Sequence, residues 1–387
     1  MTALFAPPAA GRTGRPLEPG QDPDASAFGN EKGMALLVTL AIITILIASG
    51  LELNRRVRAA VVGTAATRDR LTLSLMAASG IHTAMAMLIK DKSESPVDSI
   101  QEDWANPEKI AEVIADIPFE AGQIDVTITD ELGKIQVNAL VDFPKGRHFN
   151  ESQKIMWDRF TRLLIARDEE AFKDIEATAV INSVKDWLDS GDDDATTGLN
   201  GAEAEYYQGL DPPYMPANGP FMEIHELTRV KGIIPELFQG KDAGGLEPYV
   251  TVYGMTQVPQ EVDGKDFSFE GSININTADL PVLVAMMPSE NPDYAQAIYD
   301  YRIEKDGETF VHDLSGEGWY KNVPEIPSDL TIDPKLIRYS SDQFRIQASA
   351  RMNDIQETVT AVVQREQEKQ TGKWTCRILR WQVGKYE

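Results

Sequence analysis

The strongest hydrophobic pattern in the chain lies near its N-terminus. Residues 34–51 form a largely apolar run without a charged side chain. As a helix rising ~1.5 Å per residue, the run reaches about 27 Å, close to the ~30 Å hydrocarbon layer of a bilayer. A buried core helix is the alternative. Because the run follows a proline-rich leader, residues 1–33, whose composition is typical of disorder, the pattern favours a membrane span.

The helical pattern continues beyond the apolar run. Apolar residues recur at three- or four-residue steps as far as Leu88, which is the spacing of one helix face. No proline occurs between residues 34 and 95, and Pro96 then follows a polar run that is a plausible stop signal. We expect one helix over residues 34–95, with two shorter helices broken near Gly63 or Gly80 as the alternative.

The rest of the chain combines strand and helix patterns. Residues 122–140 alternate apolar and polar side chains around a central turn, which predicts a β-hairpin. Strand patterns return near the C-terminus, at residues 344–352, 355–366 and 375–384. Helical patterns lie between these regions, at residues 151–168 and 176–190 and in shorter runs around 223–239, 279–287 and 292–305. The order predicts an α+β fold in which a small sheet packs on the long helix and a helical insertion separates its strands.

Composition and charge exclude several classes of protein. The chain carries 37 Lys and Arg against 61 Asp and Glu, a net charge of -24, and this field opposes binding to nucleic acid. The only cysteine, Cys376, excludes an intramolecular disulfide and a paired-cysteine metal or redox site; we expect it to be a small buried apolar residue. The four histidines are scattered, and nucleophile or phosphate-loop motifs are absent from the sequence. We therefore predict that the protein is not an enzyme.

Residues 273–305 resemble a helix-hairpin-helix unit of the DNA-uptake type. Such units need a tight glycine turn whose backbone N–H groups contact phosphate, but residues 286–290 here read Met-Met-Pro-Ser-Glu. Residues 272–320 contain nine acidic and two basic residues, which gives the segment a net charge of -7. We interpret the unit as a helical module that makes protein contacts.

An acidic, glycine-containing loop follows the second predicted helix. Its carboxylates lie close together in the sequence at Asp186, Asp189, Asp192, Asp193, Asp194, Glu203 and Glu205. Crowded oxygen ligands on such a loop suit Ca²⁺, although the spacing is not that of an EF-hand. By composition alone, a solvated acidic loop is the favoured alternative.

The residues just before the apolar run, Glu31-Lys32-Gly33, resemble the end of a type IV prepilin leader. The resemblance implies that prepilin peptidase cuts between Gly33 and Met34 on the cytoplasmic side, that Met34 is N-methylated and that the apolar helix is kept. Basic residues flank the span on both sides, so charge alone does not settle its orientation. A secretory signal peptide is the alternative, with a weak cleavage motif at residues 47–50.

Several motifs together resemble the GspK family, the type II secretion minor pseudopilins of general secretion pathway protein K. They follow the cleavage motif in order, at residues 181–189, 205–207, 212–218, 226–232 and 274–278. The resemblance implies a type IV pilin-like fold, in which a long N-terminal helix packs on a small antiparallel sheet, with a large α-helical insertion domain. It divides the chain into a leader (1–33), a stalk helix (34–95), a first pseudopilin part (96–145), the insertion (146–310) and closing strands (311–387).

The same resemblance implies a function and partners. It places the chain in the bacterial inner membrane with its N-terminus cytoplasmic and its bulk periplasmic, at the pseudopilus tip with minor pseudopilins I and J and, as a further candidate, H. The major pseudopilin, prepilin peptidase and the inner-membrane secretion platform are the other expected partners, and nucleic acid is not. Structural calcium is implied in the insertion, and the ligands we select are Asp186, Asp189, Asp192, Asp193 and Glu205.

The fifth residue of the mature chain supports the tip position. Major pilins carry Glu there, and its carboxylate pairs with the terminal ammonium of the subunit above; without that partner a buried carboxylate is costly. This chain has Val38, as expected of a subunit with nothing above it, although a lipid-facing apolar residue explains it equally simply. The expected assembly residues of the span are Leu36, Leu37, Val38, Leu40, Ile43 and Leu46. Two other functions stay open: a membrane-tethered DNA-uptake protein, and a secreted, calcium-stabilised binding domain with a signal peptide.

Overall fold

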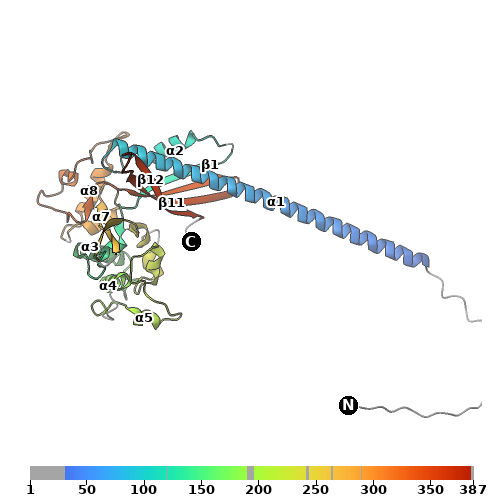
Figure 1. The fold of residues 1–387 in the computed structure, drawn as a ribbon, viewed down its shortest axis with the longest axis horizontal. Coiled ribbons are helices and arrows are strands. Elements are labelled where there is room, and N and C mark those ends of the chain that lie inside the picture. Colours follow the sequence, from blue (N-terminus) through green and yellow to red (C-terminus); the bar gives the residue numbers. More distant parts are fainter. Residues whose placement is uncertain are drawn as a thin grey trace, which may run out of the picture. The chain divides into compact units, whose positions relative to one another are not determined.

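The computed structural model of the protein describes residues 31–119, 121–189, 196–240, 244–262, 265–288 and 290–384. Most of the predicted leader lies outside these ranges. The chain divides into two compact units, Met1–Thr67 and Arg68–Glu387. Helix α1 (Glu31–Glu94) is continuous through the boundary between them and is drawn in blue in Figure 1.

Helix α1 confirms the prediction of one long helix, and the alternative of a break near Gly63 or Gly80 is wrong. It begins slightly earlier than predicted, at Glu31. Gly80 has a packing role, since a Cβ atom there would lie 2.9 Å from Cγ2 of Val126. The missing side chain therefore lets the helix backbone approach the sheet closely.

In the first unit, α1 exposes its apolar side chains. Among the described residues, one helix is long and apolar enough to cross a membrane, and none of its most apolar window is buried. Exposed hydrophobic surface of this extent is unfavourable in water by roughly 25 cal/mol per Å². An N-terminal apolar helix of this kind fits a single-pass membrane anchor.

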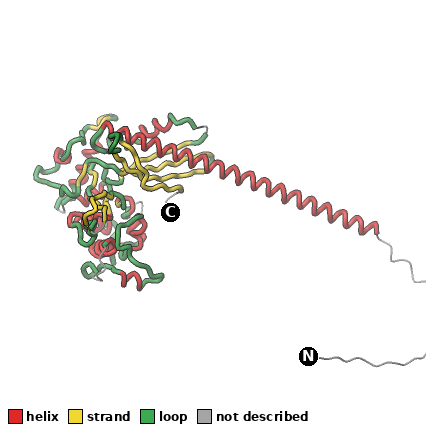
Figure 2. The backbone as a smooth tube through the Cα atoms, viewed as in Figure 1, coloured by secondary structure: helices red, strands yellow, loops and turns green. Residues whose placement is uncertain are grey.

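The second unit contains a four-stranded antiparallel sheet with strand order β1-β10-β11-β12. The strands are β1 (Gln123–Asp130), β10 (Gln343–Met352), β11 (Ile355–Gln367) and β12 (Trp374–Val383), and Figure 2 shows them lying side by side. The three C-terminal strands confirm the strand patterns at residues 344–352, 355–366 and 375–384. Strand β1 pairs with β10 in a register that places Ile128 opposite Ile346.

Helix α1 and the sheet share one hydrophobic core. The buried positions of the helix recur at three- or four-residue steps and include Leu73, Ala77, Ile81, Ala84 and Leu88. They pack with sheet residues that include Ile346, Ala348 and Val363. Helix α2 (Pro107–Ala115), which the sequence analysis did not predict, adds Ile110 and Ile114 to this core. A long N-terminal helix packed on a small antiparallel sheet is the pilin-like α+β fold that the resemblance predicts.

The insertion lies in the chain between β1 and β10 and consists mainly of short helices and loops (Figure 2). Its helices are η2 (Val137–Leu140), α3 (Glu151–Ile165), α4 (Ala177–Leu188), α5 (Ala204–Gln208), η3 (Ile224–Arg229), α6 (Pro235–Phe238), η4 (Glu247–Tyr249), α7 (Leu280–Met286), α8 (Tyr294–Ile303) and η5 (Trp319–Asn322). Its strands are short, at β2 (Ile135–Gln136), β3 (Val250–Thr251), β4 (Met255–Val262), β5 (Lys265–Phe269), β6 (Ile273–Asn274), β7 (Lys305–Asp306), β8 (Thr309–Phe310) and β9 (Ile337–Arg338). The predicted helices at 151–168 and 176–190 are confirmed by α3 and α4.

The predicted β-hairpin at residues 122–140 is wrong. Only its first half forms a long strand, β1, whose neighbour is β10. The second half contributes the two residues of β2, which pair in parallel with β3, and then turns into η2. All residues of β2 and η2 are buried. Their apolar side chains therefore pack in the insertion core, whereas a strand of a hairpin would bury only one of its two faces.

That insertion core is separate from the core under α1. It joins residues from Ile135 to Leu336 and includes the large side chains of Trp157, Phe160 and Trp187. The predicted boundaries at 146 and 310 both fall inside this range and stay a prediction.

Candidate functional site

The predicted cleavage site lies in the first turns of α1. Gly33 and Met34 are both helical, and Met34 is exposed. All the expected assembly residues, from Leu36 to Leu46, are exposed on this helix. No described residue covers these side chains. The apolar segment of α1 at residues 34–51, called the stem below, is therefore exposed along its length.

The two threonine hydroxyls of the stem are hydrogen-bonded within the helix. The hydroxyl of Thr39 donates to the carbonyl oxygens of Ala35 and Leu36 at 2.7 and 2.9 Å, and that of Thr44 donates to Ala41 at 2.8 Å. Threonines bonded in this way are compatible with an apolar surrounding. The first carboxylate after the run is Glu52, which pairs with both Arg55 and Arg56. Charge therefore begins where the predicted span ends.

A buried carboxylate cluster lies where α4 ends and α5 begins. Asp186, Asp189 and Glu203 are all buried, and one oxygen from each lies within 4.8 Å of the others. Asp186 is in the last turn of α4, Asp189 follows its end and Glu203 precedes α5. Lys185 pairs with Asp189 at 2.5 Å. Three converging carboxylates repel one another unless a cation lies between them or nearby.

The loop folds tightly onto Asp186. Its carboxylate accepts hydrogen bonds from the backbone N–H groups of Thr197, at 3.1 Å, and Ala202, at 2.8 Å. At Gly201, a Cβ atom would lie 2.0 Å from Oδ2 of Asp186, so only glycine permits this approach. On the outer side, Lys231 donates to the carbonyl oxygens of Asn200 and Gly201. The chain thereby carries Glu203 back to the end of α4.

The donor set fits a hard cation such as Ca²⁺, because the converging side chains are all carboxylates. Two of the predicted ligands, Asp186 and Asp189, are in the cluster. Glu205 is not; it lies exposed on α5, and Glu203 takes its place. The other two predicted ligands, Asp192 and Asp193, lie outside the described residues.

The aromatic residues near this loop form part of the core. Trp187 stacks on Phe221 with ring centroids 6.0 Å apart and meets the edge of Tyr207 at 5.3 Å. Both Trp187 and Tyr207 are buried. These aromatic residues therefore pack in the core and do not form a ligand cage.

The helix-hairpin-helix-like segment uses its arginine for internal hydrogen bonds. Arg302, on α8, is buried and donates from its guanidinium to the carbonyl oxygens of Ile275, at 2.7 Å, and Ala278, at 2.9 Å. Burial lowers the pKa of Arg302 to about 10. The other basic residue of the segment, Lys305, lies over the ring of Phe310. Arg302 is therefore occupied inside the protein and is not available to a phosphate.

A second charged site, which the sequence analysis missed, lies at a cavity of about 230 Å³ lined by residues of the sheet and the insertion. At this site Glu131 is fully buried and accepts from Lys134 at 3.1 Å and Arg345 at 2.6 Å. Burial alone would raise the pKa of Glu131, but the charges of Lys134 and Arg345 and the hydrogen bond from Thr251 outweigh it and lower the pKa to about 2. No sequence signal marks this group, because Arg345 and Thr251 are distant in the chain.

Cys376 is half-buried beside the core under α1, and burial raises the pKa of its thiol to about 11. A thiol with so high a pKa is a poor nucleophile at neutral pH. The sequence predicted a small buried apolar residue; the structure places Cys376 against the core but only half-buried.

Comparison with known proteins points to one family. The family model for type II secretion system protein K matches residues 133–255. Type II secretion system protein K of Klebsiella pneumoniae is 30% identical over 57% of this chain and 62% of that protein. The Aeromonas hydrophila protein is 26% identical, again over 62% of its length. The chain thus spans less than two thirds of these relatives, whereas the 26% identical Pseudomonas aeruginosa protein is covered over 72% of its length.

The fold also matches a solved structure. It is similar to a chain in the crystal structure of the GspK-GspI-GspJ complex from the type 2 secretion system of enterotoxigenic Escherichia coli, with a TM-score of 0.56 and 20% identity. The match covers 84% of this chain and 99% of that chain. At this level of identity, the match establishes that the two chains share a fold.

Proposed function

Because this chain belongs to the type II secretion system protein K family, we propose that it is a minor pseudopilin, a non-enzymatic subunit that initiates assembly of the periplasmic pseudopilus for protein export across the outer membrane. The observation that carries the proposal is the stem of α1. It is uncharged and exposed on all sides. The later part of the same helix packs on the pilin-like sheet. Such a stem suits lateral packing with other apolar helices, first in the membrane and then in a filament.

The tip of the pseudopilus is the position that suits this subunit. Val38 at the fifth mature position leaves the stem without a carboxylate for the ammonium of a subunit above it. The insertion between β1 and β10 is bulky, and its repetition along a tightly packed filament would cause clashes. The partners we propose are minor pseudopilins I and J, in keeping with the complex that holds the similar chain, together with H and the major pseudopilin. Prepilin peptidase and the inner-membrane secretion platform act on it before assembly.

Processing and location follow from the same role. Prepilin peptidase cuts between Gly33 and Met34, Met34 is methylated, and the stem stays in the inner membrane as a single span. The N-terminus then faces the cytoplasm and the sheet and insertion face the periplasm. The acidic surface suits a protein that contacts other proteins and does not bind nucleic acid.

Calcium has a structural role in this proposal. Asp186, Asp189 and Glu203 would hold the ion, with Asp192 and Asp193 as further candidates. When bound, the ion would offset the repulsion among the buried carboxylates. The hydrogen bonds that Asp186 accepts already hold the segment before α5 against the end of α4. The bound ion would strengthen this attachment.

The test is the mass of the mature N-terminus. The full chain is produced in a bacterium with a type II secretion system, extracted from the inner membrane and digested for peptide mass spectrometry. The expected first peptide begins with N-methylated Met34. A chain that begins near Leu51 would show a secretory signal peptide and refute the proposal. The wild-type chain should also co-purify with minor pseudopilins I and J.

A further inference from the structure

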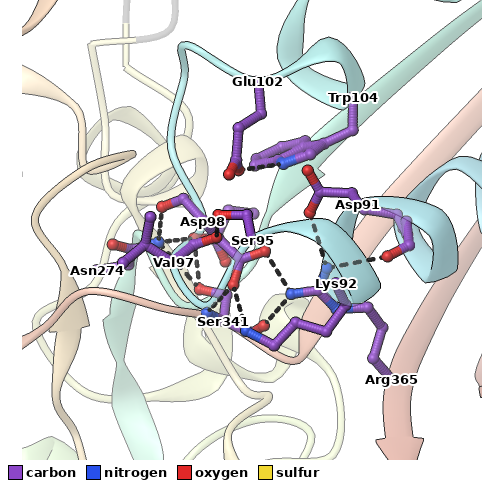
Figure 3. A network of polar contacts seen from close by, with 12 residues as sticks. Asp91, Lys92, Ser95, Val97, Asp98, Glu102, Trp104, Asn274, Ser341 and Arg365 are labelled. Carbon is purple, nitrogen blue, oxygen red and sulfur yellow. Dashed lines mark hydrogen bonds and ion pairs between the residues drawn. The ribbon is translucent and has the colours of Figure 1, made fainter. Parts of the chain in front are cut away.

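Arg365 holds the C-terminal end of α1 against the sheet. It is a fully buried residue of β11. One terminal nitrogen, Nη1, donates to the carbonyl oxygen of Leu88 at 3.1 Å and to Oδ2 of Asp91 at 3.2 Å. The other, Nη2, donates to Oδ1 of Asp98 and to the carbonyl oxygen of Ser341. One guanidinium thus connects the helix, the loop after it and the sheet (Figure 3).

Asp98 continues the connection toward the insertion. It is fully buried, and its Oδ2 accepts from the backbone N–H of Ser341 at 2.8 Å and from Lys92 at 3.4 Å. Its carbonyl oxygen accepts from the side-chain amide of Asn274 at 2.9 Å. Asn274 belongs to β6 of the insertion. The end of α1 is therefore joined to both cores of the second unit through Asp98.

Glu102 completes the group on the other side. Its Oε2 accepts from the backbone N–H of Ser99 and from the indole N–H of Trp104, both at 2.9 Å. Trp104 packs edge-on against Phe344 of β10, and the same Phe344 ring lies 4.6 Å from the Arg365 guanidinium. These contacts fix Glu102 beside the other two carboxylates, as Figure 3 shows.

The charges in this group do not balance when all are ionised. Asp91, Asp98 and Glu102 each place one oxygen within 4.8 Å of the others. Arg365 pairs with Asp91 and Asp98, and Lys92 pairs with Asp98. Burial raises the pKa of Asp91 to about 7, and the charges of Glu102 and Asp98 add to this rise while Arg365 opposes it. Asp91 is thus the carboxylate that takes up a proton near neutral pH.

We propose that Asp91, Asp98, Glu102, Lys92 and Arg365 form a proton-linked latch, closed when Asp91 carries a proton and loosened when that proton leaves to solvent. With the proton bound, the two remaining carboxylates balance the two cations and Asp91 still accepts from Arg365. Without it, a third negative charge lies beside Asp98 and Glu102 and weakens the hold on the loop at residues 95–106. The latch regulates how firmly α1 is attached to the rest of its unit. It rests on these residues alone and does not depend on the secretion role.

The sign of the pH effect follows from linkage. The folded chain keeps a proton on Asp91 up to about pH 7, whereas the ordinary pKa of the group is 3.8. Between these values the folded state binds more protons than the unfolded state, so its stability falls as the pH rises. For this group alone the folding equilibrium constant falls by up to about tenfold per pH unit in that window, and it levels off above pH 7.

Hydrogen exchange measured by mass spectrometry tests the latch on the full chain in detergent. Peptides from residues 85–105 are followed at pH 6 and pH 8, with correction for the intrinsic exchange rate. The wild-type segment should exchange several-fold faster at pH 8. Asp91→Asn, which keeps an acceptor for Arg365 but removes the charge, should abolish the difference. Asp103→Asn, an exposed carboxylate of the same loop, should leave it unchanged.

A second variant keeps the result interpretable if Asp91→Asn perturbs the fold. Glu102→Gln removes one neighbouring negative charge, which lowers the pKa of Asp91. Asp91 and Asp98 then balance Lys92 and Arg365 without a proton. If the latch operates, the segment in this variant should exchange as slowly at pH 8 as at pH 6. An unchanged pH difference in Asp91→Asn, or none in the wild type, would overturn the proposal. So would protection of this segment at pH 8 by millimolar Ca²⁺, since a metal ion would then replace the proton.

Discussion

At the residue scale, two buried carboxylates at the end of β1, Glu131 and Asp130, are stabilised by partners from distant parts of the chain. Glu131 pairs with Lys134 nearby but also with Arg345 of β10. Asp130 accepts from Asn274, Thr277 and Ser341. The sequence identifies these residues only as charged or polar, because their partners are brought together by the fold.

Glu131 allows a prediction about acid stability. Its pKa of about 2 in the folded chain lies below the ordinary 4.5, a shift that corresponds to about 3 kcal/mol of stability. This contribution is present above pH 4.5 and is lost as the pH falls toward 2. Glu131→Gln should therefore lower the melting temperature strongly at pH 6 and much less at pH 3. Glu112→Gln on the exposed face of α2 is the control, and an equal loss at both pH values would contradict the assignment.

Gly33 allows a prediction about processing. If Gly33 ends a prepilin leader, Gly33→Ala should block cleavage by prepilin peptidase and leave a chain that keeps its leader. Immunoblots of membrane fractions would show the larger form. Gly50→Ala, in the same helix and with nothing within 4 Å of its position, should mature normally. Normal maturation of Gly33→Ala would count against the prepilin interpretation.

At the element scale, the hydrophobic periodicity predicted those helices and strands whose pattern is visible within one short stretch of sequence. The long helix, α3, α4 and the last three strands follow from alternation or from steps of three and four residues. The hairpin prediction failed because β1 has its neighbour on the far side of the insertion, and the pairing of distant strands leaves no local signal. Glu203 was passed over in favour of Glu205 for a similar reason: which of them faces α4 depends on where α5 begins.

The carboxylate cluster between α4 and α5 allows a prediction about calcium. Removal of Ca²⁺ from the full chain by a chelator should lower its melting temperature by several degrees, since a ligand at a hundredfold excess over its Kd stabilises by about 2.7 kcal/mol. Asp189→Asn should abolish this shift, and Glu203→Gln should do the same. Glu205→Gln, which changes an exposed carboxylate of α5, should keep it. A chelator effect that survives both cluster variants would place the ion elsewhere.

At the scale of the whole molecule, the two units differ in what they expose and bury. The first unit exposes apolar side chains along α1, whereas the second unit buries its apolar side chains in two cores. The sequence predicted the exposed apolar helix, because an uncharged run is visible without a structure. It did not predict the contacts between the two cores, which depend on single residues such as Arg365 and Asn274.

Val38 allows a prediction about assembly. In a subunit at the tip, Val38→Glu would place a carboxylate in apolar surroundings with no ammonium above it, at a cost of roughly 2–3 kcal/mol. Co-purification with minor pseudopilins I and J from membranes should fall by about tenfold or more. Val38→Leu should retain wild-type levels. If Val38→Glu assembles as well as the wild type, the subunit does not occupy the tip.

The pairing of β1 with β10 has a consequence for biogenesis. A ribosome releases β1 first and the whole insertion next, so the sheet lacks its first pair of neighbouring strands until Gln343–Met352 has emerged. Until then the apolar face of α1 at Leu73, Ile81 and Leu88 has no complete cover. The insertion, whose core is its own, is the part able to condense while translation continues. Nascent chains interrupted before β10 should therefore aggregate through the exposed apolar face of α1 unless a chaperone binds it.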